Sequence, residues 1–414
     1  MDQFFDPSRG RLGLNRRVFL LGAGISAGSA MASWPVAASA ATPSAAELVA
    51  GKDPRLIVHT ARPCVFETPV ELLATDNVTP VELLFVRNNQ QPSTAFTIKP
   101  LELANWKIEL SGLVDRRIEF DARLLGSLPQ VEHEMVLQCS GNSRSLFARS
   151  VATKGSPWGR GGMGNVRFGG VPLSALLDHQ GLKIDPQAQF LTAEGIDEPA
   201  VGEQDFEHSL PLDEALKKSV LALRMNGEPL PAIHGGPVRL VTLGYYGTMH
   251  IKWLSRLRFT ARESDQTSQI PNYRTPRLPI NPGDPFTATY QNSEPNWRMK
   301  TKCVVLAPAA GSRLSPGATL VRGVAFNDGE ARIETVLISS DSGRTWRAAE
   351  LEHPKSAFAW SRWQCRVDLP TGRQQVWARA IDALGRGQPA DGSVHWNPQG
   401  YTWNGMEKIE LIVG

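Results

Sequence analysis

Cys139 is the residue with the clearest potential for chemistry. It follows the short apolar run Met135-Val136-Leu137 and opens a Ser-Gly-Asn turn at residues 140–142. A cysteine at a strand end, beside backbone that a ligand can approach closely, offers a thiolate suited to a soft or high-valent metal. On this stretch alone, a buried structural cysteine is the competing interpretation. The other residues of the chain are needed to choose between a metal ligand and a structural cysteine.

The other cysteines are Cys64, Cys303 and Cys365, and no two of the four form a CxxC pair. Such wide spacing argues against a structural zinc site, a c-type haem and a four-cysteine iron–sulfur cluster. In an exported chain the four cysteines would allow three disulfide pairings, and the sequence does not choose among them. Any redox centre must therefore be held by something other than a cysteine-rich motif.

The N-terminus has the layout of an export signal. Asn15-Arg16-Arg17-Val18-Phe19-Leu20 leads into an apolar run that ends at Ala32, and Ala38-Ser39-Ala40 supplies small residues for cleavage. The paired arginines favour the twin-arginine route, so residues 1–41 are predicted to be its signal peptide. A buried N-terminal helix is the alternative. We expect a periplasmic mature chain without a membrane span, because the run is shorter than the roughly 20 residues that cross a bilayer.

The region after the signal mixes short helical and strand patterns. Leu173–Leu177 and Leu212–Leu216 have helical spacing, whereas Pro237–Val241 and Ile251–Leu254 are typical of strands. Short elements between many glycines and prolines favour an α+β domain, which we place at residues 50–285.

The chain changes character towards its C-terminus. Residues 272–295 are rich in Pro, Asn, Thr and Gly and are predicted to be a linker or a surface-wrapping segment. From residue 299 onwards, apolar runs such as Ile333–Ile338 and Val376–Ala380 alternate with Asp/Gly turns such as Asp341-Ser342-Gly343. This pattern predicts an all-β immunoglobulin-like sandwich at 299–414, without a helical stretch.

Length and charge limit the class of protein. With 414 residues the chain is long enough for more than one core. Its formal net charge of +3 is small for that length and gives no reason to expect nucleic-acid binding.

Several short motifs follow one another after the predicted signal. They are Thr79-Pro80 with Phe85-Val86-Arg87-Asn88-Asn89, Cys139-Ser140-Gly141-Asn142, Met225-Asn226-Gly227 with Leu230-Pro231 and His234-Gly235-Gly236-Pro237-Val238-Arg239, Gly247-Thr248-Met249-His250-Ile251-Lys252-Trp253, and Asp341-Ser342-Gly343-Arg344-Thr345-Trp346. In this order and at these separations they resemble motifs of the sulfite oxidase family of molybdenum enzymes. Each match alone is weak, but the ordered set is specific and spans nearly the whole mature chain.

The resemblance implies a molybdenum–molybdopterin cofactor with Cys139 as the protein's metal ligand. The implied pterin-binding residues are Phe85, Arg87, Asn88, Asp197, His234, Arg239, His250 and Lys252. Their chemistry agrees with this role, because cationic donors suit a phosphate and a carboxylate accepts ring N–H groups. Taken singly, the histidines could equally be core residues and Asp197 an ordinary turn residue.

The resemblance also implies a pocket for a small anion. Its implied members are Arg87, Arg144, Trp158 and Tyr273, with Arg362 as a weaker candidate because it is displaced by one position from the family's β-domain arginine. A solvated surface position for the arginines and a core position for Trp158 are the alternatives. Two residues depart from the family pattern: Asn89 replaces a histidine, and Ser143 stands where animal enzymes have an arginine.

The implied function is that of a sulfite dehydrogenase. Oxygen-atom transfer would convert sulfite to sulfate, and the electrons would pass to a separate periplasmic cytochrome c, since this chain has no haem motif. The β-sandwich implies a homodimer. A sulfane dehydrogenase acting on carrier-bound sulfur and a reductase running the transfer backward are alternatives within the family. A non-catalytic periplasmic binding protein would explain the β-rich C-terminus, but not the ordered Cys, His, Arg and Lys positions.

Overall fold

The computed structural model describes residues 43–90, 103–199 and 201–414. Residues 42–414 form one compact unit, and the predicted signal at 1–41 lies outside the described residues. None of the helices in these described ranges is long and apolar enough to cross a membrane.

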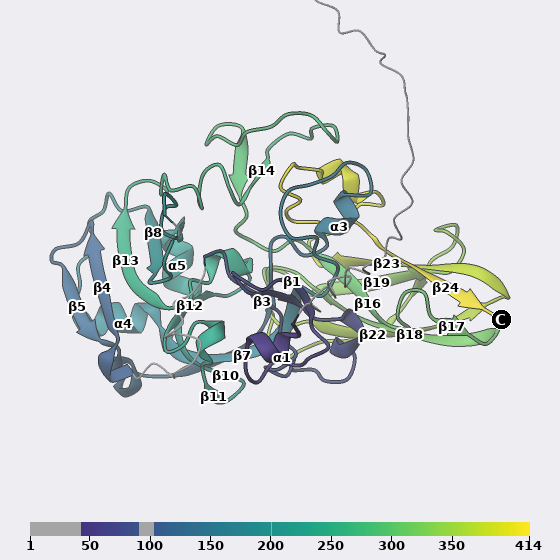
Figure 1. The fold of residues 1–414 in the computed structure, drawn as a ribbon, viewed down its shortest axis with the longest axis horizontal. Coiled ribbons are helices and arrows are strands. Elements are labelled where there is room, and N and C mark those ends of the chain that lie inside the picture. The colour runs from purple at the N-terminus through teal and green to yellow at the C-terminus, as the bar shows by residue number, and fades with distance from the viewer. Residues whose placement is uncertain (1–42, 91–102, 200) are drawn as a thin grey trace, which may run out of the picture. The chain divides into compact units, whose positions relative to one another are not determined.

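The first part of the chain contains two five-stranded sheets and two small ones. The antiparallel sheet that carries Cys139 at a strand end has the order β11-β10-β7-β6, with β12 also paired to β10 (Figure 1). Its strands are β6 (Val131–Gln138), β7 (Met163–Pro172), β10 (Ser219–Met225), β11 (Glu228–Pro229) and β12 (Arg239–Thr242). A mixed sheet has the order β5-β4-β13-β8-β9. Its strands are β4 (Lys107–Gly112), β5 (Ile118–Asp121), β8 (Phe190–Gly195), β9 (Glu207–Pro211) and β13 (Leu254–Thr260).

The two small sheets border the candidate site. One is formed by β1 (Ile57–Thr60), β2 (Val65–Glu67) and β3 (Val86–Arg87). The other is a hairpin of β14 (Arg274–Pro276) and β15 (Ser293–Pro295). This hairpin lies within the stretch predicted to be a linker or wrapping segment, which therefore has some regular structure.

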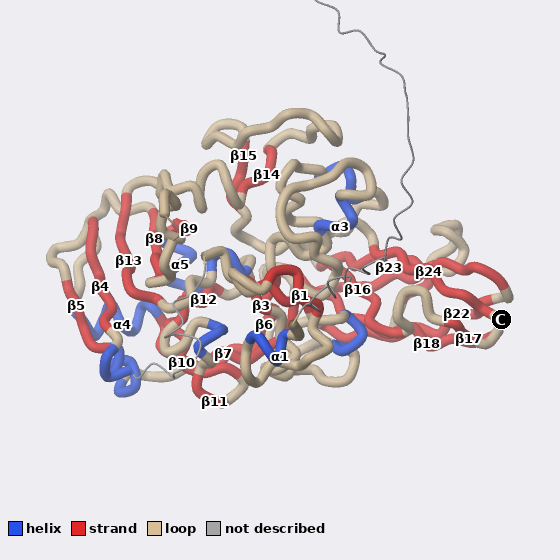
Figure 2. The backbone as a smooth tube through the Cα atoms, viewed as in Figure 1, coloured by secondary structure: helices blue, strands red, loops and turns tan. Residues whose placement is uncertain are grey.

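The helices are short and lie between strands (Figure 2). They are α1 (Ala45–Leu48), α3 (Arg144–Phe147), α4 (Leu173–Gln180) and α5 (Leu212–Lys218), with 3-10 turns η1 (Val70–Leu73), η2 (Leu103–Asn105), η3 (Ala122–Ser127), η4 (Ala232–His234), η5 (Gly247–Met249) and η6 (Gly392–His395). Both helices expected from helical spacing are present as α4 and α5. The left-handed Gly181 (φ 57°) ends α4, and the Glu214–Lys218 ion pair of 2.7 Å stabilises α5.

The C-terminal part is a two-sheet sandwich. One sheet has the order β16-β18-β22-β21 and the other β17-β24-β23-β19-β20. The strands are β16 (Lys302–Ala307), β17 (Arg313–Leu314), β18 (Gly317–Phe326), β19 (Ile333–Ser339), β20 (Arg347–Ala348), β21 (Glu350–Glu352), β22 (Ser361–Leu369), β23 (Gly372–Asp382) and β24 (Glu407–Val413). Buried and exposed residues alternate along β22 and β24, as expected where one face of each sheet covers a core.

The predicted fold class, an α+β part followed by an all-β sandwich, is confirmed. Two details were wrong. Ile251–Leu254 is not a strand, because Trp253 has a left-handed φ of 49° and β13 begins only at Leu254. The sandwich also contains one helical turn, η6, which begins where Asp391 accepts a hydrogen bond from the Ser393 N–H.

An apolar cluster joins the two parts. Val70, Leu73, Val136, Met163 and Tyr246 of the first part pack against sandwich residues Val304, Leu306, Val324, Phe326 and Trp360. Buried aromatic and aliphatic groups each contribute roughly 1.5–3 kcal/mol when removed from water. The sandwich is therefore held firmly against the strand, β6, that ends at Cys139.

Glu67 is a buried carboxylate that fixes the chain around Trp158. Its oxygens accept the N–H groups of Gly159 at 2.8 Å and Gly161 at 2.9 Å, and His59 Nε2 lies 2.8 Å away.

A Glu67→Gln change places an amide NH2 against one of these N–H groups and leaves it unpaired. We expect the free energy of unfolding to fall by about 1–3 kcal/mol, measured by urea denaturation. Glu119→Gln, on an exposed position of β5, serves as the control and should leave the midpoint unchanged.

Candidate functional site

A cavity opens where the ends of several strands converge. It is lined by Phe85, Arg87, Asn88, Asn89, Leu137, Cys139, Ser140, Asp197, Phe206, His234, Arg239, Gly247, Thr248, His250, Lys252, Trp253 and Tyr273. These residues come from the end of β3, the end of β6, the loops flanking β8, β12 and β13, and the segment before β14. The fold thus brings together residues spread across nearly two hundred positions of sequence.

Cys139 lies at the rim of this cavity in a tightly held turn. The turn is closed by the Asn142 N–H, which donates to the Cys139 carbonyl at 2.9 Å, and Asn142 Oδ1 accepts the Gly162 N–H at 3.0 Å. The Gly141 N–H lies 3.4 Å from the Cys139 sulfur and donates to it. The thiolate is the form of cysteine that binds metals.

Basic side chains gather on one side of the cavity. Lys252 Nζ donates to Asn88 Oδ1 at 2.7 Å and to the Ile233 carbonyl at 2.8 Å. Arg239 is buried, and its Nη1 donates to the His234 carbonyl at 3.1 Å. Burial lowers the pKa of Arg239 to about 9 and, together with the nearby Arg239, holds the pKa of Lys252 well below its usual value. Such shifts mark cations held without enough counter-charge, so the site favours an anionic ligand.

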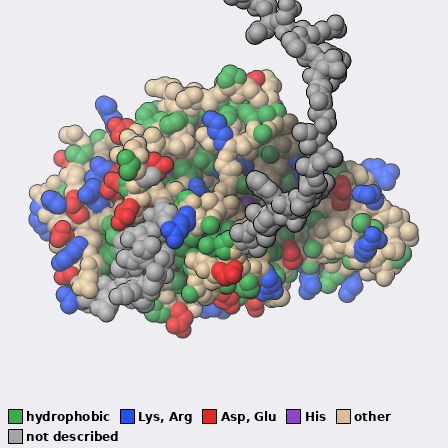
Figure 3. Space-filling view, in the orientation of Figure 1, with side chains coloured by type: hydrophobic (Ala, Val, Ile, Leu, Met, Phe, Trp, Pro, Cys, Tyr) green, Lys and Arg blue, Asp and Glu red, His purple; other side chains and the backbone are tan. Residues whose placement is uncertain are grey.

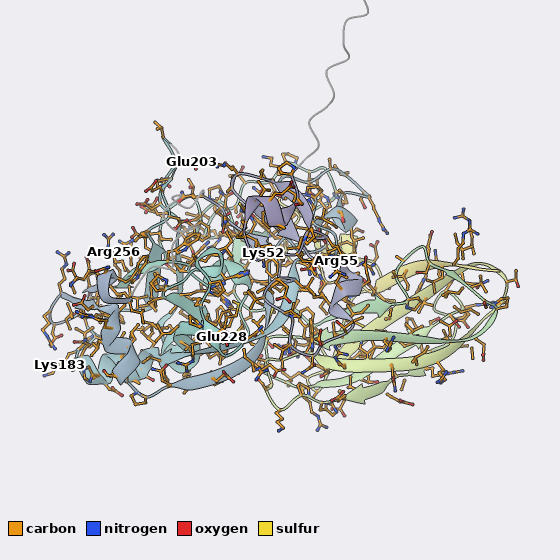
Figure 4. All side chains as sticks on the ribbon, turned by 60° about the horizontal axis from the view of Figure 1, so that its bottom comes forward. Lys52, Arg55, Lys183, Glu203, Glu228 and Arg256 are labelled. Carbon is orange, nitrogen blue, oxygen red and sulfur yellow. The ribbon has the colours of Figure 1, made fainter. Side chains whose placement is uncertain are left out.

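Lys52 is a further basic residue next to Arg239 and Lys252, and it contacts His234. Its Nζ donates to the carbonyls of Val81 at 2.6 Å and Leu84 at 2.7 Å and lies 3.1 Å from His234 Nε2. While Lys52 is protonated its ammonium group only donates, so His234 Nε2 is then the acceptor. Burial lowers the pKa of Lys52 to about 7 and, with the neighbouring cations, holds the pKa of His234 well below its usual value. In Figure 4 Lys52 lies among the central elements of the molecule.

Polar atoms of the lining are left unpaired. Asn88 Nδ2, Ser140 Oγ, Arg239 Nε and His250 Nδ1 are buried and have no hydrogen-bond partner among the residues that the structure describes. His250 Nε2 lies 2.9 Å from the Thr242 carbonyl and must donate to it, so Nδ1 carries the free lone pair. Burial lowers the pKa of His250 to about 3 and raises that of Asp197 to about 6. Unpaired buried donors and acceptors are costly unless a ligand satisfies them.

This donor set fits the implied molybdenum–pterin group. Within residues 43–90, 103–199 and 201–414, no cluster of three or more His, Cys, Asp or Glu side chains could hold a metal ion by itself. A metal near Cys139 would therefore need further ligands that are not side chains of this kind, as a pterin cofactor supplies. The cavity offers that group cationic donors on Arg239 and Lys252 for negative charge, and Asp197 as an acceptor.

Arg87 and Tyr273 form a second polar part of the cavity lining. Arg87 Nη2 lies 3.5 Å from the Tyr273 hydroxyl, and both groups donate to Asn89 Oδ1. The amide at position 89, where the family pattern has a histidine, thus ties the arginine to the tyrosine. These donors could bind a small oxyanion at the mouth of the cavity.

Three predicted pocket residues are not on the cavity lining. Arg144 donates to the carbonyls of Gln399 at 2.8 Å and Ser156 at 2.9 Å, behind the Cys139 turn. Trp158 is fully buried and packs edge-on against Phe85, with ring centroids 5.9 Å apart. Their proposed roles stay predictions. Arg362 lies in a separate cleft and donates to the carbonyls of Ala74 and Asp76, because β22 directs it towards η1.

Sequence reasoning missed several residues of the site. Ser140 and Thr248 lie within the quoted motifs and could have been included from their position beside Cys139 and His250. Phe206, which precedes β9, and Lys52 belong to no quoted motif. All four cysteines, each within the described ranges, are free thiols, so no disulfide contributes to the site.

Comparison with known proteins gives matches over the same two parts. Residues 95–268 match the oxidoreductase molybdopterin binding domain, and residues 293–413 match the Mo-co oxidoreductase dimerisation domain. The chain is 31% identical over 375 residues to sulfite oxidase of Gallus gallus, covering 87% of this chain and 79% of that protein.

Other relatives are more distant or longer. Mitochondrial sulfite oxidase of Homo sapiens is 28% identical over 374 residues, covering 87% of this chain and 66% of its own length. The crystal structure of the sulfane dehydrogenase SoxCD from Paracoccus pantotrophus is similar in fold, with a TM-score of 0.70, 24% identity and 84% coverage of both chains.

The depressed pKa of Lys52 predicts how the stability of the cofactor-free protein depends on pH. Between its folded pKa of about 7 and its ordinary value of 10.5, the unfolded chain binds a proton that the folded chain does not. Stability should therefore rise with pH in this range. We expect the free energy of unfolding to increase from pH 7 to 9.5 and the Lys52→Met variant to show a flatter dependence. Lys183→Met, an exposed position at the edge of the molecule in Figure 4, should keep the wild-type slope; equal slopes for all three would contradict the assignment.

Proposed function

Because the chain belongs to the sulfite oxidase family of molybdenum enzymes, we propose that it oxidises sulfite to sulfate in the periplasm and passes the electrons to a cytochrome c. The observation that carries the proposal is the convergence of Cys139, the basic side chains and the unpaired polar atoms on one cavity. Nitrate reductase of Fusarium oxysporum is also similar in sequence, at 27% identity, so the relatives' names do not by themselves choose the substrate.

The proposed cofactor-holding residues follow from the geometry. Cys139 would be the thiolate ligand of the metal, and the free atoms Arg239 Nε, His250 Nδ1 and Asn88 Nδ2 would bind the pterin. When bound, the molybdenum–pterin group supplies two-electron oxygen-atom transfer, a chemistry that no protein side chain provides. The chain itself supplies binding, orientation and exclusion of water.

Arg87 and Tyr273 are the proposed substrate-binding groups. The guanidinium provides fixed positive charge, and the Tyr273 hydroxyl lies 3.5 Å from Arg87 Nη2, where its O–H would exchange Asn89 Oδ1 for the bound anion. The apolar lining residues Phe85, Leu137 and Phe206 lower the local dielectric, which strengthens these interactions with a small anion. Sulfite, a pyramidal oxyanion with a sulfur lone pair, fits the charge of this part of the cavity.

The surrounding assembly is part of the proposal. The predicted signal at residues 1–41 supports export by the twin-arginine route. A cytochrome c as the electron acceptor is part of the same proposal. The match of residues 293–413 to a dimerisation domain supports a homodimer formed through the sandwich. On the face shown in Figure 3, basic and acidic side chains are interspersed, without a patch of one sign.

Turnover by protein purified from the periplasmic fraction tests the proposal. We expect one molybdenum atom per protein chain, and we expect the protein to reduce cytochrome c when sulfite is added. Sulfur bound to a thiol carrier and a sulfoxide, assayed in parallel, separate the sulfane dehydrogenase and reductase alternatives. A molybdenum-loaded protein that does not oxidise sulfite would refute the substrate assignment, and a molybdenum-free protein would refute the enzyme as a whole.

The ligand assignment predicts the behaviour of Cys139→Ser. A serine hydroxyl is a harder and far less acidic ligand than a thiol, so metal content and sulfite turnover should both fall by at least about 100-fold. Cys365→Ser, on β22 of the sandwich, is the matched control and should keep both. Circular dichroism should show that both variants are folded. A Cys139→Ser protein with normal molybdenum and activity would exclude this cysteine as the ligand.

A further inference from the structure

A segment of the sandwich docks on the turn that carries Cys139. The segment, residues 396–403, lies between η6 and β24. Its Thr402 N–H donates to the Ser140 carbonyl at 2.7 Å, and its Gln399 carbonyl accepts from Arg144 Nε at 2.8 Å. Gln399 Nε2 also lies 3.5 Å from Asn272 Oδ1, next to Tyr273. The sandwich segment therefore contacts both chain stretches that border the substrate side of the cavity.

Tyr401 is the residue of this segment that lies nearest to the proposed substrate groups. Its ring stacks on the Tyr273 ring, with centroids 5.0 Å apart and planes inclined by 20°. The Arg144 guanidinium carbon lies 5.3 Å from the centroid of the same ring. One aromatic ring thus contacts a tyrosine and an arginine that the sequence places in the anion pocket.

The Tyr401 ring is held in place by its own backbone. Asn397 Oδ1 accepts the Tyr401 N–H at 2.9 Å, and Asn397 Nδ2 donates to the Tyr401 carbonyl at 3.0 Å. Gly400 has a left-handed φ of 61°, and a Cβ there would come within 2.5 Å of Arg144 Cγ. Only glycine lets the segment approach Arg144 this closely, so the ring position is fixed by local structure and not by the Tyr273 contact alone.

Tyr273 depends on such outside support. Its backbone adopts a left-handed φ of 51°, a conformation that costs a non-glycine residue free energy. Its ring meets Phe206 and His208 edge-on, at centroid distances of 6.1 Å and 5.2 Å, and presents a face to Tyr401. The stacked ring therefore limits where the Tyr273 hydroxyl can lie relative to Arg87.

We propose that Tyr401 is a positioning residue of the substrate site, by which the sandwich fixes the Tyr273 hydroxyl beside Arg87. The proposal rests on the proposed sulfite oxidation, because it assigns Tyr401 an effect on that reaction. It gives the C-terminal sandwich a part in building the active site, independent of any part in dimer formation.

Kinetics of the loaded enzyme test the proposal with two substitutions of similar volume. Tyr401→Phe keeps the stacked ring and should stay within about twofold of wild type. Tyr401→Met keeps apolar volume but removes the flat ring, and kcat/KM for sulfite should fall about tenfold, mainly through KM. Tyr290→Met is the matched control, because Tyr290 also lies over an arginine, Arg274, at 5.3 Å, but its exposed ring is not stacked on Tyr273. Equal kinetics of Tyr401→Met and wild type, at equal molybdenum content, would overturn the proposal.

A double-mutant cycle separates positioning from general packing. If Tyr401 acts by placing the Tyr273 hydroxyl, the Tyr401→Met loss should shrink to less than about threefold in a Tyr273→Phe background. An undiminished loss in that background would show that Tyr401 does not act through Tyr273 and would overturn the assignment. Should Tyr401→Met fail to fold, Asn397→Ala frees the segment while keeping the ring, and it should raise KM for sulfite by a smaller factor. An unchanged KM in Asn397→Ala would then count against the proposal.

Binding of sulfate to the loaded protein distinguishes this proposal from the proposed function. Calorimetric titration should show weaker sulfate binding to Tyr401→Met than to wild type, whether or not sulfite is the true substrate. Weaker binding without sulfite turnover would refute the proposed reaction and leave the positioning role supported. Equal sulfate binding by the two proteins would overturn the positioning role even if sulfite is oxidised.

Discussion

The site depends on one electrostatic constraint: cationic side chains are held in the protein interior with little opposing charge. Lys52 and Arg239 are buried, and Lys252 lies beside them on the cavity wall. Backbone carbonyls of Val81, Leu84, Ile233 and His234 accept their N–H groups and offset part of the cost. The remaining positive potential is relieved by loss of a proton or by binding of an anion, so the shape of the surrounding loops and the chemistry of the ligand are coupled.

Much of this arrangement could be predicted because it is local in sequence. The Cys139 turn, the helices α4 and α5 and the sandwich strands each follow from a short pattern of residue types. Ten of the thirteen predicted site residues, Arg362 included in the count, line one cavity. Local patterns failed where a single backbone angle decided the outcome, as at Trp253, whose left-handed φ delays β13 to Leu254.

What the sequence could not predict is contact between distant segments. Lys52 lies outside every motif, near the N-terminal end of the described chain. Its sequence neighbours do not indicate that His234 is its partner. Arg362 is conspicuous beside Trp363 in the sequence, yet the strand direction of β22 turns it towards Ala74. Likewise, Asn89 shows its importance only when Arg87 and Tyr273 are both seen to donate to it. These relations depend on tertiary packing, which residue spacing does not encode.

The distance in sequence between Lys52 and Tyr401 has a consequence for biosynthesis. These residues support opposite sides of one site, yet almost the entire chain separates them. During synthesis, residue 401 must leave the ribosome and the sandwich must fold before the Tyr401 ring can pack against Tyr273 and Arg144. Nascent chains can therefore form the basic cavity earlier than the finished substrate side. A chain that ends before Tyr401 would still contain Lys52, Arg239 and Lys252 but would lack the stacked ring, so cofactor retention alone is a poor measure of a completed enzyme.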